Sequence, residues 1–284
     1  MLHMLEHAFV HSIEDSIKIV PFLFVTYLLM EYIEHKTNNK LVGILKGPKG
    51  GPVLGGIVGM IPQCGMSAMA SNFYSGRMIT AGTLIAVFLS TSDEMLPIML
   101  SHSIPIGEIG KILIFKAIIA MIAGLLIDLV FKLWKKDKED LRIHAMCEHE
   151  HCHCEEGILR SAIHHTIHIF IFIVLITFFI NLGIEWIGEE TLAGTILNHP
   201  LVGPITAGII GLIPNCAASV VITTMYLDGF MSFGTLMAGL LAGAGVGTIV
   251  LLRVNQEKKE SLGIIGLLYV IGTVTGIVLN FIGV

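Results

Sequence analysis

The stretch GIVGMIPQCGMS, residues 56–67, occurs a second time in the chain as GIIGLIPNCAAS, residues 208–219. Both copies read G-I-x-G-x-I-P, then an amide residue, then C-x-x-S, and they are 152 positions apart. A match of this length within one chain indicates an internal duplication.

The duplication extends beyond this stretch. At the same offset, Tyr74 matches Tyr226 and Gly124 matches Gly276. At the start of each half, residues 8–31 match residues 162–185 at an offset of 154. The sequence therefore predicts two halves of the same construction.

The composition indicates a lipid environment. Of the 284 residues, 54% are hydrophobic and only 14% are charged. Soluble domains carry about 25% charged residues. We therefore expect the lipid bilayer as a partner and no nucleic-acid partner.

Each half divides into the same segments, and each full-length segment has the roughly 20 apolar residues that a membrane crossing needs. The predicted fold is an all-α membrane protein with two inverted-topology repeats, each containing three transmembrane helices and a Pro-broken re-entrant helical hairpin, ten segments in all. The helices are expected at 8–33, 79–100, 109–133, 162–187, 231–252 and 262–282, and the hairpins at 53–74 and 202–226. The predicted domains are repeat 1 (1–133), a His/Cys/Glu-rich linker (134–158) and repeat 2 (159–284).

Lys and Arg decide the orientation, because their excess marks the cytoplasmic side. Basic clusters lie at 36–49, 132–142 and 253–259, and all three are cytoplasmic if the broken segments are re-entrant. Three crossings per half is an odd number, so the second half is inverted. Both termini are then external, and the linker is cytoplasmic.

The hairpin tips are the first candidates for substrate binding. A proline breaks the helix and frees backbone carbonyls and amides. Two thiols brought together would suit a thiophilic species, although buried cysteines are often only packing residues. The candidate residues at the tips are Pro62, Gln63, Cys64, Ser67, Pro214, Asn215, Cys216 and Ser219.

Asp93 and Glu94 are further substrate-binding candidates. They lie inside a predicted membrane helix, where carboxylates are costly and usually functional, and the matching positions of the second half are Gly245 and Val246. They could bind a divalent cation or exchange a proton, or they could pair with a neighbouring Lys. Asp128, whose counterpart is Asn280, is more typical of a structural polar contact.

The linker has the most metal-like sequence. Dense His and Cys tracts bind zinc or softer transition metals, so the linker could hold such an ion, but no obligatory cofactor is expected. The linker candidates are His144, Cys147, His149, His151, Cys152, His153 and Cys154. His11 with Asp15, and His164 with His168, share a helix face and could also bind metal, or could be interfacial polar residues.

The paired G-x-I-P-x-C-x-x-S motifs on a duplicated ten-segment chain resemble the heavy-metal exporters of bacteria. These are relatives of the ArsP-type permeases and are often labelled arsenic-efflux or manganese-transport proteins. The resemblance implies efflux across the bacterial inner membrane, without identifying the ion. Six residues match the family motif: Pro62, Cys64, Ser67, Pro214, Cys216 and Ser219.

The predicted function is a secondary transporter that exports a heavy-metal or metalloid species by alternating access at two opposed hairpin tips. Its cargo would be arsenite-like or a divalent transition metal such as Mn or Zn. No nucleotide-binding signature is present, so a proton or other ion gradient is expected as the energy source. We predict no enzymatic activity, and a homo-oligomer is compatible with this plan. The alternatives are a carrier for a small organic or anionic solute and a metal-responsive sensor that acts through the linker.

Overall fold

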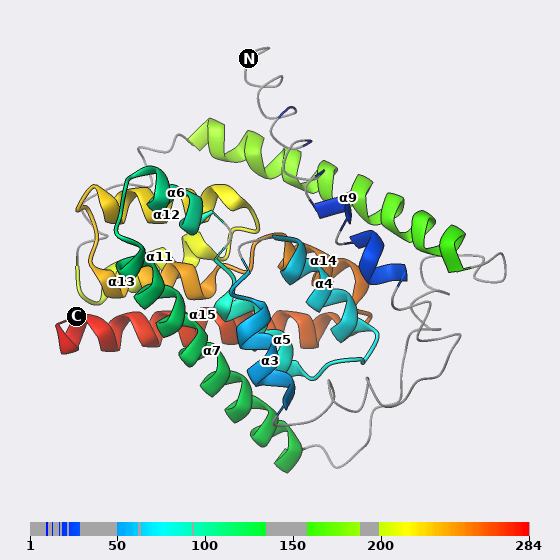
Figure 1. The fold of residues 1–284 in the computed structure, drawn as a ribbon, viewed down its shortest axis with the longest axis horizontal. Helices are drawn as coiled ribbons and strands as arrows, with labels where there is room; N and C mark the ends of the chain where they lie inside the picture. The colour runs from blue at the N-terminus through cyan, green and yellow to red at the C-terminus, as the bar shows by residue number, and fades with distance from the viewer. Residues whose placement is uncertain are drawn as a thin grey trace.

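A computed structural model describes residues 10, 13, 17, 19–21, 23–28, 50–61, 64–92, 94–134, 158–187 and 199–283, and the secondary structure of this part of the chain is α-helical (Figure 1). The first half contains α3 (Gly50–Val58), α4 (Cys64–Ser75), α5 (Ala81–Ser90), α6 (Met95–Ser101) and α7 (Ile106–Trp134). The second half contains α9 (Ile158–Ile187), α11 (Val202–Gly211), α12 (Cys216–Leu227), α13 (Phe233–Ala242), α14 (Val246–Val254) and α15 (Lys258–Ile282).

The helices of the two halves begin at matching positions. The starting residues of α3 and α11 are 50 and 202, those of α4 and α12 are 64 and 216, those of α5 and α13 are 81 and 233, and those of α7 and α15 are 106 and 258. Each pair differs by 152, the offset of the sequence motifs. Matching local sequences thus start these four pairs of helices at equivalent positions in the two halves.

Five spans in the described residues are long and apolar enough to cross a membrane, and they divide into outer and inner ones. In an apolar 18-residue window of each of the spans Ile106–Leu133 and Lys258–Ile282, only 33% of the residues are buried, so α7 and α15 present apolar faces outward. In the corresponding windows of Ala81–Ser101 and Phe233–Val254, 71% and 83% are buried. Apolar side chains exposed along a helix of this length indicate contact with lipid, and the inner spans form the centre of the bundle.

The prediction of continuous helices at 79–100 and 231–252 is wrong. The first span is divided into α5 and α6 by residues 91–94, and the second into α13 and α14 by residues 243–245. Thr91 donates its hydroxyl to the Val87 carbonyl oxygen (2.7 Å), a local bond that competes with helical continuation. Gly245 has a φ of +51°, which glycine adopts most easily.

The second helix of each Pro-broken segment packs against the opposite half. Helix α4 lies against α14, and α12 lies against α6. Figure 1 shows α4 and α14 side by side. Within each half, the first part of the inner span packs on the long outer helix, α5 on α7 and α13 on α15. Elements of both halves therefore meet at the centre.

Glycine pairs bring α5 to α7 and α13 to α15. A Cβ on Gly124 would lie 2.5 Å from the carbonyl oxygen of Gly82, and one on Gly276 would lie 2.4 Å from that of Gly234. Small residues that let backbones approach closely are typical of helix pairs in membranes. The matched glycines thus set the distance between inner and outer helices in both halves.

We expect Gly124→Ala to destabilise the protein by about 1–3 kcal/mol, because the added methyl group forces the two backbones apart. Thermal unfolding of the detergent-purified protein measures this effect. The control is Gly266→Ala on α15, where an added Cβ meets nothing within 4 Å. Equal stability of the two variants would contradict the close packing.

Candidate functional site

Three helix breaks meet at one small buried cavity, the central cavity, of about 20 Å³. A volume of this size holds about one water-sized species. The break in the first inner span contributes Thr91 and Ser92, the Pro-broken segment of the second half contributes Gly211, Asn215, Cys216, Ala218 and Ser219, and the second inner span contributes Gly239, Leu240, Gly243 and Gly245.

The start of α12 forms the most chemically varied wall of the central cavity. The Asn215 side-chain oxygen accepts from the Ala217 backbone N–H (3.3 Å) and caps the helix. Cys216 is a buried cysteine that lines the cavity. Ser219 donates to the Cys216 carbonyl oxygen (2.9 Å). The helix N-terminus and one thiol therefore lie together at this wall.

Lys116 is the charged side chain beside the central cavity that the sequence analysis missed. It lies within α7 and is fully buried. Its ammonium group donates to the carbonyl oxygen of Thr91 and to that of Leu240 (3.1 Å). These two carbonyls lie at the C-terminal ends of α5 and α13, one in each half. The signal was present in the sequence, because a lone lysine in the apolar stretch ILIFKAIIAMI is functional by default.

Several predicted site residues lie outside the described part of the chain. Cys64 is the first residue of α4, and its side chain lies outside the described part of the structure. The residues outside are Pro62, Gln63, Asp93, His11, Asp15, His144, Cys147, His149, His151, Cys152, His153 and Cys154.

Ser67 and Glu94 are described but do not line the central cavity. Ser67 lies on α4 and is fully buried against α14. A Cβ added to Gly247 of α14 would lie 2.7 Å from the Ser67 Cβ. Glu94 is half-buried at the start of α6 and makes no side-chain cap. Ser67 therefore contributes to the contact between the halves.

Asp128 has a structural role. It accepts the Thr80 hydroxyl (2.6 Å) and the Gly82 backbone N–H (2.8 Å) at the start of α5. In the second half, the Ser232 hydroxyl donates to the Asn280 side-chain oxygen (2.7 Å). The same cap therefore holds both inner spans.

In the described part of the chain, no group of three or more His, Cys, Asp and Glu side chains could hold a metal ion. His164 and His168 lie on an exposed face of α9 with their ring centroids 5.3 Å apart. Within the described residues no third ligand joins these two rings, so they do not complete the usual tetrahedral protein site.

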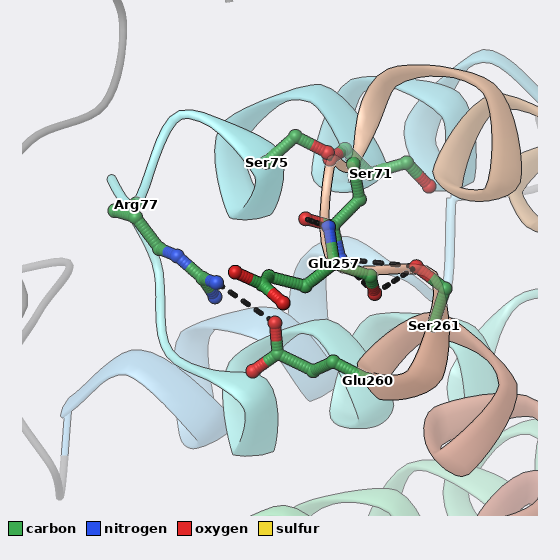
Figure 2. Close-up of polar contacts among 7 residues, drawn as sticks. Ser71, Ser75, Arg77, Glu257, Glu260 and Ser261 are labelled. Atoms are coloured by element: carbon green, nitrogen blue, oxygen red, sulfur yellow. Dashed lines mark hydrogen bonds and ion pairs between the residues drawn. The ribbon is translucent and has the colours of Figure 1, made fainter. Parts of the chain in front are cut away.

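At one end of the bundle a contact joins the two halves, the Arg77–Glu260 contact. Figure 2 shows Arg77 reaching from the turn after α4 to Glu260 in the first turn of α15, at a distance of 2.8 Å. The Arg77 guanidinium carbon also lies 5.2 Å from the centroid of the Tyr74 ring. Arg77 is 5% exposed and Glu260 22% exposed, so water screens this pair less than a surface pair.

The equivalent end of the other half has no counterpart of the Arg77–Glu260 contact among the described residues. Glu108 precedes Glu260 by 152 residues, Tyr226 follows Tyr74 by 152, and Gly229 stands where Arg77 stands. Here Glu108 pairs with Lys111 of its own helix (2.7 Å), and both are well exposed. A pocket of about 590 Å³, the Glu108 pocket, lies at this end and is lined by Met99, Ile104, Pro105, Glu108, Lys111, Ile112, Phe115, Tyr226, Leu227 and Phe233.

The apolar spans around a buried polar centre are typical of a multi-span membrane protein. The chain matches the family model described as "Putative, 10TM heavy-metal exporter" over residues 4–186 and 170–284. The protein belongs to this family, which is a transporter family and not an enzyme family. No curated protein and no solved structure matches the chain.

Proposed function

We propose that this protein is a secondary transporter that exports a heavy-metal or metalloid species across the bacterial inner membrane. The observation that carries the proposal is the central cavity, which broken helices of both halves line together. Broken helices at bilayer depth occur where the backbone lines a substrate path. Family membership supports metal export as the general activity.

The chemistry of the cavity favours a soft ion or metalloid of few atoms. Cys216 offers a sulfur ligand, and Thr91, Ser92 and Ser219 offer hydroxyl groups. Thiolates select soft species, whereas Mn²⁺ prefers oxygen ligands. The volume of about 20 Å³ suits one small species better than an organic solute. We therefore place an arsenite-like or zinc-like cargo ahead of the organic or anionic solute.

The proposed mechanism is alternating access between inverted halves. Helix α12 reaches from the central cavity at Ser219 to the Glu108 pocket at Tyr226, about 10 Å at 1.5 Å per residue. With the basic clusters on the cytoplasmic side, the Arg77–Glu260 contact would be cytoplasmic and the Glu108 pocket would be external. This conformation would thus be closed on the cytoplasmic side and open on the external side. In the opposite conformation the cytoplasmic end would be open and the external end closed, and the switch between the two would move the cargo.

The remaining predicted residues have secondary roles in this proposal. Gln63 and Cys64 would bring the first-half tip to the same cargo, and Asp93 or Glu94 would carry a coupling proton or balance the charge of a cation. A proton or other ion gradient would supply the energy. The linker would collect metal on the cytoplasmic side, where a sensor function is the competing hypothesis.

Replacement of the cavity thiol should weaken transport of a soft cargo. Mutation of residues that only hydrogen-bond to metal ligands lowers metal affinity by about 10–100-fold. Cys216 is proposed as a direct ligand, so Cys216→Ser should reduce arsenite flux at least about tenfold at low concentration. Proteoliposomes assayed with As(III), Zn²⁺ and Mn²⁺ under an imposed proton gradient measure this. The control is Ser101→Ala, at an exposed residue outside the central cavity and the Glu108 pocket, which should leave flux unchanged.

Two results would contradict this assignment. Unchanged As(III) and Zn²⁺ flux in the double variant Cys64→Ser/Cys216→Ser would exclude the thiols as ligands. A wild-type protein without flux of any of the three species would favour the sensor hypothesis.

Loss of the Arg77–Glu260 contact should open the cytoplasmic side. Hydrogen bonds to charged groups are worth about 1.5–3 kcal/mol, so Arg77→Ala or Glu260→Gln should raise the labelling rate of a nearby buried site about tenfold. The reporter is Ser75→Cys, at a residue now 7% exposed, in a background without other cysteines. A membrane-impermeant maleimide applied to the cytoplasmic face of vesicles measures the rate.

The control variant is Lys111→Ala, which breaks the exposed Glu108–Lys111 pair. Exposed pairs contribute about 0–1 kcal/mol, so this change should leave the Ser75→Cys labelling unchanged. If neither Arg77→Ala nor Glu260→Gln accelerates labelling, the contact does not close this side.

A further inference from the structure

Lys116 is a fully buried cation in the apolar helix α7, and it bonds to both halves. The amino group donates to the carbonyl oxygens of Thr91 and Leu240. Thr91 is the C-cap residue of α5, and Leu240 lies in the last turn of α13. One lysine therefore joins the two broken spans next to the central cavity, which both residues line.

The two carbonyls form a site that is suited to a cation. The last carbonyls of a helix lack intrahelical partners, and the C-terminal end of a helix carries partial negative charge. Here two such ends, one from each half, converge on the same ammonium group. A monovalent cation at this position would meet the same oxygen ligands.

The lysine at this site occurs in the first half and has no lysine counterpart in the second half. The position that matches Lys116 in the second half is Leu268, which is also fully buried. The duplicated fold therefore does not require a lysine there for packing. Lys116 is one of the positions where the halves differ next to the central cavity.

We infer that the ammonium group of Lys116 is a tethered cation that fills a monovalent-cation site between the ends of α5 and α13. In transporters of inverted repeats, unwound carbonyls and half-helix C-terminal ends coordinate the coupling Na⁺ or proton. In this protein the chain itself supplies the positive charge, so transport needs no bound Na⁺ or K⁺. This inference rests on the proposed function for its role in transport, but the cation site itself does not.

The titratable groups around this site belong to the neighbouring elements. Among the described residues, Cys216 at the start of α12 lines the same cavity, and Glu94 directly precedes α6. On α7 itself, Asp128 is engaged by Thr80 and Gly82. The test therefore uses one fixed pH and varies only the cation.

The decisive experiment restores the missing cation in Lys116→Ala. The substitution removes the equivalent of n-propylammonium, so thermal unfolding of the purified variant is measured with n-propylammonium, with Na⁺, and with 1-propanol as the neutral molecule of similar size. We expect n-propylammonium to raise the melting temperature of Lys116→Ala and 1-propanol to have little effect. Lys111→Ala, an exposed lysine on the same helix, is the matched control and should not respond.

Equal stabilisation by 1-propanol, or none by either cation, would overturn the inference, because the lysine would then only fill space. This readout needs no cargo, so it remains valid if the proposed function fails. Should Lys116→Ala not be recovered from membranes, Lys116→Gln keeps a donor for the carbonyls without the charge. Its melting temperature should fall below that of the wild type, and a wild-type value would overturn the inference.

Flux provides the second measurement. Wild-type flux should be independent of Na⁺ and K⁺, and Lys116→Gln should lose flux at least about tenfold, which corresponds to 1.4 kcal/mol. Wild-type flux that requires Na⁺, or a Lys116→Gln variant with full flux, would contradict the tethered cation.

Discussion

The structure depends on one constraint: backbone groups at a helix break inside a membrane must find partners within the protein. Both inner spans break at mid-length, and the Pro-broken segment of the second half ends a helix beside them. The exposed carbonyls and amides at these ends are bonded by Lys116 and Asn215. The hydroxyls of Ser90, Thr91 and Ser92 bond to neighbouring carbonyls of the same segment. The result is a polar centre within an apolar bundle.

Comparison of the two halves distinguishes residues that hold the fold together from candidate functional residues. Residues that match between the halves hold the helices together, as the glycine pairs and the caps at Asp128 and Asn280 do. The positions that differ between the halves include residues at the centre and at the two ends. Lys116 is aligned with Leu268, and Arg77 is aligned with Gly229.

Much of the fold could be predicted from the sequence, because the repeat and the apolar lengths are strong local signals. The breaks at Pro62 and Pro214 and the long helices at 109–133 and 262–282 are reproduced within a few residues as helix ends and helices. The breaks in the inner spans were missed, because single hydroxyl residues and glycines also occur within helices. At these ends the Thr91 hydroxyl bond and the positive φ of Gly245 act locally. Lys116, which is distant in the sequence, bonds the carbonyl oxygens of Thr91 and Leu240.

The sequence predicted those site residues that lie in the Pro-broken motif, but not the contacts between distant segments. Cys216, Asn215 and Ser219 lie at the cavity as the Pro-broken motif indicated, whereas Ser67 lies between α4 and α14. Lys116 and the Arg77–Glu260 contact join segments that are far apart in the sequence, so pairing could not be read from spacing. The inverted orientation in the membrane and the roles of Asp93 and Glu94 stay predictions.

The central claim is that one cavity is reached from one side of the membrane at a time. The most direct measurement is the reaction of Cys216, as the single cysteine of the protein, with an impermeant maleimide added to either face of oriented vesicles. The account predicts labelling from the external face alone, and a switch to the cytoplasmic face when Arg77→Ala is introduced. Simultaneous labelling from both faces would indicate a channel and would contradict the account, as would a thiol that reacts from neither face in either protein.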